Sequence, residues 1–301
     1  MKRTETMLRM FLGLGLAGVI GGAAALWLTQ PATVDENAFA QVTADAARGE
    51  FVFWAAGCAS CHAAKGADGE AKLVLAGGRR FATAFGTFVA PNISPSSQGI
   101  ETWSILDLAN AMQKGTSPGG SHYYPAFPYT SYANATLQDV ADLKAFLDTL
   151  PGSDTPSAPH ELTFPFNIRA TLGGWKLLFA DPGWVVTGDL TPAEDRGRYL
   201  AEALGHCGEC HTPRNALGGR VTSQWLAGAK NPSGTGRIPN ITPGALPWTE
   251  AEIAEYLTTG FTPDYDMVGG EMVEVVENLA RLPDSDRAAI AAYLKRVPAV
   301  E

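Results

Sequence analysis

Apolar residues recur along residues 41–301 at the three-to-four-residue spacing of amphipathic helices. The pattern predicts helices over 104–114, 137–150 and 250–259, and a last helix that ends before Pro298. Residues 77–80 and 231–237 are rich in glycine or proline and are predicted to be loops. No stretch alternates apolar and polar residues for long enough to indicate a sheet. The sequence therefore predicts an all-α fold.

Threonines begin several of these helices. Thr191 and Thr249 are each followed three positions later by glutamate, the arrangement of a capping box, and Thr136 precedes the segment 137–150. These side chains can accept hydrogen bonds from the free amides of the first turn. We therefore expect helices to begin just after each of these positions.

Residues 10–29 carry no charge, and as a helix they would span about 30 Å, the thickness of a bilayer core. Basic residues precede this segment and acidic residues follow it. The charge bias predicts a single-pass anchor in the inner membrane, with residues 1–9 cytoplasmic and the remainder periplasmic. A cleaved signal peptide is the alternative, but Ala38-Phe39-Ala40, its best cleavage site, comes late and after acidic residues.

The part of the chain after this segment contains an internal repeat. The pentapeptide at 58–62, Cys-Ala-Ser-Cys-His, returns at 207–211 as Cys-Gly-Glu-Cys-His. Other landmarks recur at similar offsets, namely Arg48-Gly49 with Arg196-Gly197, Pro91-Asn92-Ile93 with Pro239-Asn240-Ile241, and Trp103 with Trp248. The repeat predicts one domain at 41–151, a linker at 152–190 and a copy of the domain at 191–301.

Each pentapeptide has the spacing of a covalent haem site. Cys58 and Cys61 in the first copy, and Cys207 and Cys210 in the second, would bind the porphyrin through thioethers. His62 and His211 would then be the proximal iron ligands, and the chain would hold two haem c groups. A redox disulfide or half of a zinc site is the alternative. Neither alternative explains a histidine after both pairs.

The sixth iron ligands are predicted from the repeat. Met272 lies twelve residues after Gly260, which follows the helix at 250–259, and a thioether is a common sixth ligand. The matching residue of the first half is Phe127, which cannot bind iron. His122, on the same loop, is the candidate for the first haem. Met272 could instead only fill the core, and His122 could be exposed to solvent.

Further histidines and one methionine are weaker candidates. Met112 fits the buried face of a helix, His206 directly precedes Cys207, and His160 belongs to the linker. Within that linker, residues 164–169 and 173–179 are too aromatic for a flexible tether. We expect a short helix there that packs across both domains, and a membrane-surface role is the alternative.

The formal net charge is −9. Such a surface disfavours binding to nucleic acid and favours docking to a basic partner. The acidity could instead only keep an exported domain soluble.

These motifs resemble the membrane-anchored multihaem cytochrome c subunits of periplasmic dehydrogenases that act on alcohols, gluconate, aldehydes or nicotinate. The likeness covers nearly everything after residue 40 and rests on both haem motifs, on Tyr-Pro-Ala-Phe-Pro-Tyr at 124–129, on Phe-Pro-Phe-Asn at 164–167 and on Gly-Glu-Met-Val-Glu-Val-Val at 270–276. Many relatives have methionine where this chain has Phe127.

The resemblance implies two tandem cytochrome c domains that relay electrons and do not transform a substrate. A dehydrogenase or a respiratory complex would be the donor, and a soluble cytochrome c or a terminal oxidase would be the acceptor. The alternative is a peroxidase-like dihaem enzyme with an open site at the first haem, which would need a distal acid or base.

Overall fold

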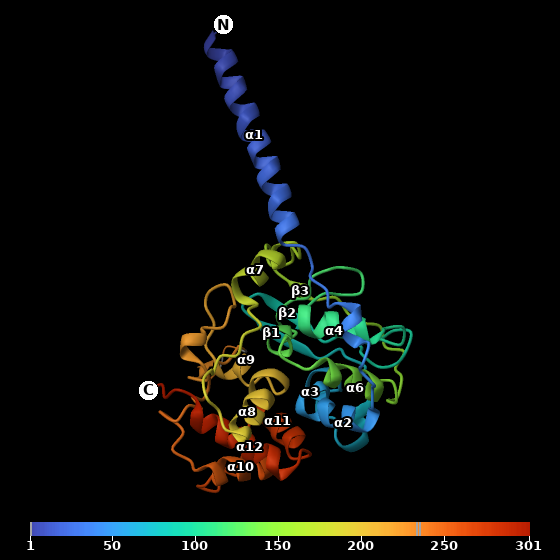
Figure 1. Cartoon of the computed structure of the whole chain (residues 1–301), viewed down its shortest axis with the longest axis vertical. Helices are drawn as coiled ribbons and strands as arrows, with labels where there is room; N and C mark the ends of the chain where they lie inside the picture. The colour runs from blue at the N-terminus through green and yellow to red at the C-terminus, as the bar shows by residue number, and fades with distance from the viewer. Residues whose placement is uncertain (1, 233, 235) are drawn as a thin grey trace.

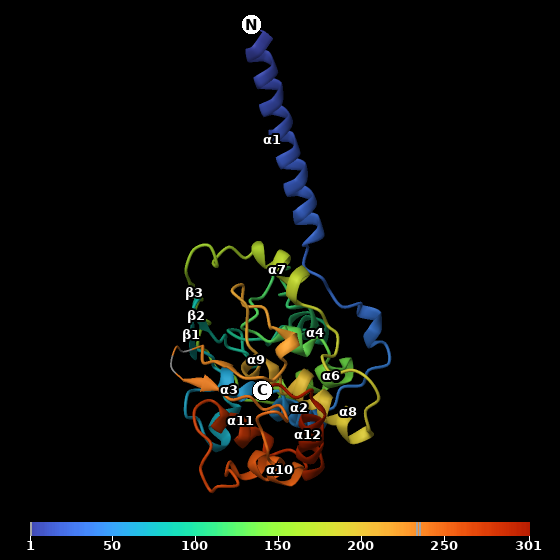
Figure 2. The ribbon, with the colours of Figure 1, turned by 90° about the vertical axis from the view of Figure 1, so that its left-hand side faces the viewer.

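The computed structural model describes residues 2–232, 234 and 236–301, without the side chains of residues 2–11, 14, 17 and 26. Helix α1 projects from a body of short helices and loops (Figures 1 and 2). The elements of the first half and the linker are α1 (Lys2–Leu28), α2 (Ala46–Ala55), α3 (Cys58–His62), β1 (Arg80–Thr83), β2 (Gly86–Val89), α4 (Ile105–Lys114), α5 (Tyr129–Tyr132), α6 (Leu137–Leu147), β3 (Glu161–Leu162) and α7 (Thr171–Phe179). Those of the second half are α8 (Pro192–Arg198), α9 (Gly208–His211), β4 (Ala229–Lys230), β5 (Arg237–Ile238), α10 (Glu250–Thr259), α11 (Met272–Leu279) and α12 (Asp284–Arg296).

Short 3₁₀ and π segments complete the chain. The 3₁₀ turns lie at Glu36–Phe39, Gly69–Leu73 and Thr222–Gln224, and a π-helical turn at Tyr199–Leu204 continues α8 toward the second haem motif. The predicted helix starts are confirmed. Thr191 and Thr249 form capping boxes at α8 and α10, and Thr136 caps α6. Helix α6 ends at Leu147, three residues before the predicted end.

Each half is built on a crossing of two helices, α2 with α6 and α8 with α12. Gly49 lies at the first crossing, where an added Cβ would lie 1.9 Å from the carbonyl oxygen of Asp142. Gly197 lies at the second, where an added Cβ would lie 1.9 Å from the carbonyl oxygen of Ala289. The repeated Arg-Gly pair therefore has a structural reason, because only glycine lets the two backbones approach so closely.

The arginines that precede these glycines form hydrogen bonds across the same two helix crossings. Nε of Arg48 donates to the Asp142 carboxylate at 2.7 Å, and Nε of Arg196 donates to Asp286 at 2.8 Å. The Arg48 guanidinium helps to hold the pKa of Asp142 below its usual value, although burial acts in the opposite direction. The internal repeat thus extends from sequence to side-chain contacts.

The predicted all-α fold is confirmed in part, because the chain is rich in helices but the described residues also include short strands. Strand β2 pairs antiparallel with β1 and β3, with Arg80 opposite Val89 and Gly86 opposite Leu162, and β4 pairs with β5. Each strand has two to four residues. Alternation is recognised over four to eight residues, so the pattern could not reveal the two-residue strands, and the four-residue strands β1 and β2 lie at its lower limit.

Residues 10–28 of the predicted anchor lie in α1, and residue 29 follows the helix. The side chains of residues 10, 11, 14, 17 and 26 lie outside the described set. In the part of the chain that can be described, no helix reaches the length and hydropathy expected of a membrane span. Large apolar side chains of α1 are exposed, among them Leu16, Val19, Trp27 and Leu28.

The predicted packing of the linker across both halves is confirmed for α7. Nζ of Lys176 donates to the carbonyl oxygens of Lys114 and Gly115 at 2.6 and 2.8 Å, which ties α7 to the first half. Nε1 of Trp175 donates to the carbonyl oxygen of Leu217 at 2.8 Å, which ties it to the second.

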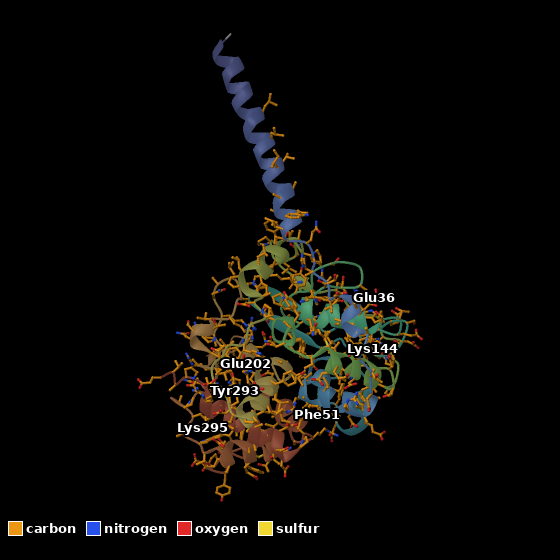
Figure 3. All side chains as sticks on the ribbon, in the orientation of Figure 1. Glu36, Phe51, Lys144, Glu202, Tyr293 and Lys295 are labelled. Atoms are coloured by element: carbon orange, nitrogen blue, oxygen red, sulfur yellow. The ribbon has the colours of Figure 1, made fainter. Side chains whose placement is uncertain are left out.

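A buried polar network fixes the end of the linker to the second half (Figure 3). The Glu202 carboxylate accepts hydrogen bonds from the backbone amides of Val185 and Val186 and from the Tyr293 hydroxyl at 2.6 Å. The Tyr293 hydroxyl in turn accepts a hydrogen bond from Nε1 of Trp225. These contacts satisfy a carboxylate that is otherwise costly to bury.

Candidate haem sites

Both haem motifs lie on short helices at the ends of longer ones. Gly57, with φ of 62°, turns the chain from α2 into α3, and His206, with φ of 39°, makes the matching turn into α9. In each motif the first cysteine is half-buried and the second is exposed. The second thiol of each pair is therefore open to solvent, where a porphyrin can reach it.

The two proximal histidines have the same backbone partner. Nδ1 of His62 bonds to the carbonyl oxygen of Pro91 at 2.9 Å, and Nδ1 of His211 bonds to that of Pro239 at 2.9 Å. A carbonyl accepts, so Nδ1 carries the proton and Nε2 is left as the nitrogen with a lone pair. A second partner that fixes the ring and the tautomer in this way is typical of metal-binding histidines. The two histidines, with Nε2 free to bind a metal, therefore fit the role of proximal ligands to haem iron.

Burial favours the neutral imidazole at both histidines. It lowers the pKa of His62 and the pKa of His211, against the smaller opposite effect of the proline carbonyls. A lowered pKa favours the neutral imidazole, which is the form that binds a metal.

Backbone contacts reproduce this arrangement in both copies. The amide of Gly77 donates to the carbonyl oxygen of His62 at 2.8 Å, and the amide of Gly228 donates to that of His211 at 2.7 Å. Both glycines have positive φ, at 72° and 82°. The loop after each motif is thus hydrogen-bonded to the histidine of that motif.

The thiols do not have the properties of a redox disulfide. Burial raises the pKa of Cys58 to about 12 and the pKa of Cys207 to about 12. Reactive Cys-x-x-Cys pairs instead have a lowered thiol pKa. Within the described residues, no group of three or more histidine, cysteine, aspartate and glutamate side chains is placed to bind a metal ion directly.

Known proteins are similar to this chain. A model of the cytochrome c family matches residues 46–151. A dihaem c-type cytochrome of Cereibacter sphaeroides is 64% identical over 296 residues, which cover 98% of this chain and the whole of that protein. The chain belongs to the dihaem c-type cytochromes. It carries two haem c groups and functions in electron transfer.

Other relatives of this dihaem cytochrome are subunits of dehydrogenases. The fructose dehydrogenase cytochrome subunit of Gluconobacter japonicus is 41% identical, over 84% of this chain and 52% of that subunit. The gluconate 2-dehydrogenase cytochrome c subunit of Pantoea cypripedii is 33% identical, over 84% of this chain and 59% of that subunit. The chain thus spans little more than half the length of these longer relatives.

The loops that were predicted to supply sixth ligands match in the two halves of the dihaem cytochrome. Thr116 forms an isolated antiparallel bridge with His122, and Phe261 forms one with Met267. Met272, at the start of α11, is partly buried and packs on the main core, whereas Met267 is 69% exposed. The structure therefore distinguishes the two methionines and turns Met272 inward.

In the first half, Phe127 occupies the position of Met272. Its ring packs against Tyr123 and Tyr132, with ring centres 5.9 and 5.8 Å apart. The loop thus keeps an apolar residue at this place but has no thioether there.

His122 is buried, and the carbonyl oxygen of Thr29 accepts a hydrogen bond from its Nε2 at 2.9 Å. Its Nδ1 is buried and has no hydrogen-bond partner. Burial, with a contribution from Lys176, lowers the pKa of His122. The ring is therefore neutral with an unpaired lone pair on Nδ1.

The weaker candidates have other partners. His160 accepts a hydrogen bond at Nδ1 from the backbone amide of Val89, and His206 packs edge-on against Tyr132. Met112 is buried in the main core, as its helical spacing predicts.

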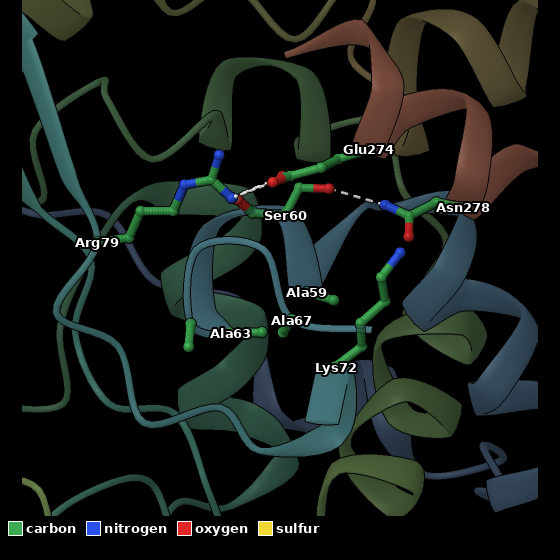
Figure 4. Close-up of a pocket in the computed structure, with 9 residues that line it drawn as sticks. Ala59, Ser60, Ala63, Ala67, Lys72, Arg79, Glu274 and Asn278 are labelled. Atoms are coloured by element: carbon green, nitrogen blue, oxygen red, sulfur yellow. Dashed lines mark hydrogen bonds and ion pairs between the residues drawn. The ribbon is translucent and has the colours of Figure 1, made fainter. Parts of the chain in front are cut away.

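Helix α11 of the second half covers the first haem motif (Figure 4). The Arg79 guanidinium bonds the Glu274 carboxylate at 2.6 Å and also donates to the carbonyl oxygen of Ser60. Nδ2 of Asn278 donates to the Ser60 hydroxyl at 2.8 Å. Lys72, beside this site, pairs with Glu277 at 2.5 Å.

Helix α5 of the first half covers the second haem motif in return. Glu209, inside that motif, accepts hydrogen bonds from the hydroxyls of Thr130 at 3.0 Å and Ser131 at 3.1 Å. It also pairs with Arg214 and Arg220. Burial opposes ionisation, but these arginines hold the pKa of Glu209 below its usual value. Each haem motif is therefore contacted by a helix of the other half.

The contacts of Arg79 and Glu209 were not predicted from the sequence. Arg79 lies in a segment predicted only to be a loop, and Glu209 was identified only as a residue of the second pentapeptide. Neither Pro91 nor Pro239 was expected to act through its carbonyl oxygen. The recurrence of Pro91-Asn92 as Pro239-Asn240 was the sequence signal that could have identified these prolines.

Proposed function

We propose that this dihaem cytochrome relays electrons, one at a time, from a dehydrogenase to a soluble cytochrome c or a terminal oxidase. The relatives named as dehydrogenase subunits support the choice of donor. A respiratory complex is the second candidate donor. The observation that carries the proposal is the exchange of covering helices, because it holds two haem motifs of one chain against a shared interface.

The proposal assigns the cofactor contacts residue by residue. The thioethers come from Cys58 and Cys61 in domain 41–151 and from Cys207 and Cys210 in domain 191–301. His62 and His211 bind iron through Nε2, and the hydrogen bonds to the proline carbonyls support this assignment. The haem supplies an iron that changes oxidation state, and the protein sets its potential through ligands and burial.

The sixth ligands are proposed separately for the two haems. Met272 is assigned to the second haem, supported by its inward position. His122 is assigned to the first haem through Nδ1, supported by the buried lone pair without a partner.

Residues 10–29 are proposed to anchor the chain in the inner membrane, with residues 1–9 cytoplasmic and the haem domains periplasmic. The uncharged segment, the basic residues before it and the exposed apolar side chains of α1 support this orientation. The acidic remainder of the chain would then meet basic electron carriers in the periplasm.

A reconstitution experiment tests the relay. The full chain is produced with covalent haem, haem content is measured as the pyridine haemochrome, and a dehydrogenase with its substrate is added together with oxidised basic cytochrome c. We expect two haems per chain, reduction of both, and passage of electrons to the acceptor at a rate that falls as salt rises.

Several outcomes would overturn the relay. One haem per chain would contradict the assignment of two haems. An acceptor that stays oxidised while both haems are reduced would show that electrons do not pass on to it. Carbon monoxide binding with peroxide turnover at the first haem would instead identify the peroxidase-like enzyme, which the relatives do not favour.

A further inference from the structure

The buried and exposed side chains of helix α7 are the reverse of those expected for a helix in water. Its lysine, Lys176, is turned inward, where Nζ caps the carbonyls of Lys114 and Gly115 and lies 4.8 Å from the centre of the Tyr129 ring. Leu177 and Leu178 point outward and are 67% and 69% exposed. A surface helix normally turns charged residues outward and leucines toward the core.

The segment that leads into α7 has the same character. Phe164 is 79% exposed, and Phe166 and Ile168 are also exposed. With Leu177 and Leu178 they form what we call the α7 platform. Both views place α7 and the segment from β3 toward it at the end of the body nearest α1 (Figures 1 and 2). Five large apolar side chains exposed on two adjoining segments are typical of an interaction surface.

Direct contacts place the platform at the end of α1. The carbonyl oxygen of Thr29 accepts the hydrogen bond from His122, whose chain neighbours belong to the first half. Gly173 of α7 lies against the same residue, since an added Cβ would lie 2.4 Å from the carbonyl oxygen of Thr29. Trp27 and Leu28, which are exposed at the end of α1, therefore directly precede the residue that contacts α7.

We infer that the α7 platform is a second membrane contact, which lies in the headgroup region of the bilayer beside the point where α1 leaves it. Tryptophan at the end of an apolar helix and leucines on an adjoining surface helix suit that region, where an apolar face meets lipid and the backbone stays solvated. The inference rests on the proposed anchor. Two contacts with the membrane would fix how the haem domains face it, which one helix alone would not.

Single cysteines can report the position of the platform. The four native cysteines are consumed by haem, so Leu178→Cys adds the one free thiol to the matured chain. The full chain is labelled with a fluorophore, reconstituted in phosphatidylcholine and phosphatidylglycerol vesicles, and quenched with brominated lipids or with aqueous iodide. Met267→Cys is the matched control, because this side chain is 69% exposed on the second half. Val19→Cys reports on α1.

We expect lipid quenching at position 178 at a depth of about 5–10 Å below the headgroups, and iodide quenching alone at position 267. If position 19 is quenched by lipid and position 178 only by iodide, the inference falls and the anchor stands. If position 178 is shielded from both quenchers, a protein covers the platform and the inference also falls. If position 19 is not quenched by lipid, the anchor fails, and quenching at position 178 then shows surface binding alone. Unchanged haem absorption confirms that each variant is folded.

Discussion

At the residue scale, the two halves differ most at the position that would supply a sixth iron ligand. Met272 and Phe127 occupy corresponding places, and both pack on the core. Only the thioether has a lone pair to give to iron. With Met272 as the sixth ligand, as proposed above, the second haem would have the higher potential, because a methionine ligand raises the potential of a haem iron.

Met272→Leu removes that lone pair and keeps most of the volume. We expect the second haem to lose its methionine ligand and its potential to fall, since Met/His ligation raises it. An optical redox titration should show one wave shifted and the other unchanged. Met267→Leu is the control and should shift neither wave. A shifted wave in Met267→Leu, with none in Met272→Leu, would instead assign Met267 as the sixth ligand.

His122→Gln tests the sixth ligand of the first haem. Glutamine can still donate to the Thr29 carbonyl, but it offers no imidazole lone pair in place of Nδ1. We therefore expect the first haem to become high-spin, as seen in its absorption and electron paramagnetic resonance spectra. If both haems remain low-spin, His122 only joins the first half to the end of α1.

At the scale of elements, the crossings of α2 with α6 and of α8 with α12 depend on one glycine each. Gly49→Ala would place a methyl group 1.9 Å from the carbonyl oxygen of Asp142. Because the helices must move apart, we expect a loss of about 1–3 kcal/mol in the free energy of unfolding. Urea titration of the full chain measures it.

Gly174→Ala is the control for this prediction. An added Cβ at Gly174, within α7, would meet nothing within 4 Å. Alanine at such a place is expected to raise the free energy of unfolding by about 0.4–1 kcal/mol, since it restricts the unfolded chain. Equal losses at Gly49 and Gly174 would show that the crossing is not the cause.

The same elements show what the sequence can predict. Helices α4 and α10 begin where a serine or threonine cap and an acidic residue three positions later indicate, because capping is a local interaction. The strands escaped prediction because they are short and are held by pairing partners, as with Gly86 and Leu162. Candidate haem-binding residues could be named from the sequence because the two cysteines and the histidine of each motif lie within five positions. The pair of Arg79 and Glu274 could not, since it joins residues far apart in the chain.

At the scale of the whole molecule, each half contributes a helix that contacts the haem motif of the other. Helix α11 lies over α3 through Arg79 and Glu274, and α5 lies over α9 through Glu209. Two domains joined only by a linker would hold their haems at a variable distance. The exchanged contacts, together with α7, make the two halves one unit and would keep the path for an electron constant.

Glu274→Gln tests this coupling. The Arg79 side chain is only 12% exposed and would lose its ion pair, so we expect a loss of about 1–3 kcal/mol in the free energy of unfolding. Glu161→Gln is the matched control, because it breaks the pair of the adjacent Arg80, which is 54% exposed and whose loss should cost about 0–1 kcal/mol. Urea unfolding is followed separately through the absorption of the two haems. If Arg79 and Glu274 hold the halves together, the two transitions coincide in the unchanged chain and separate in Glu274→Gln. Coincident transitions in both variants, with equal losses, would mean that other contacts unite the halves.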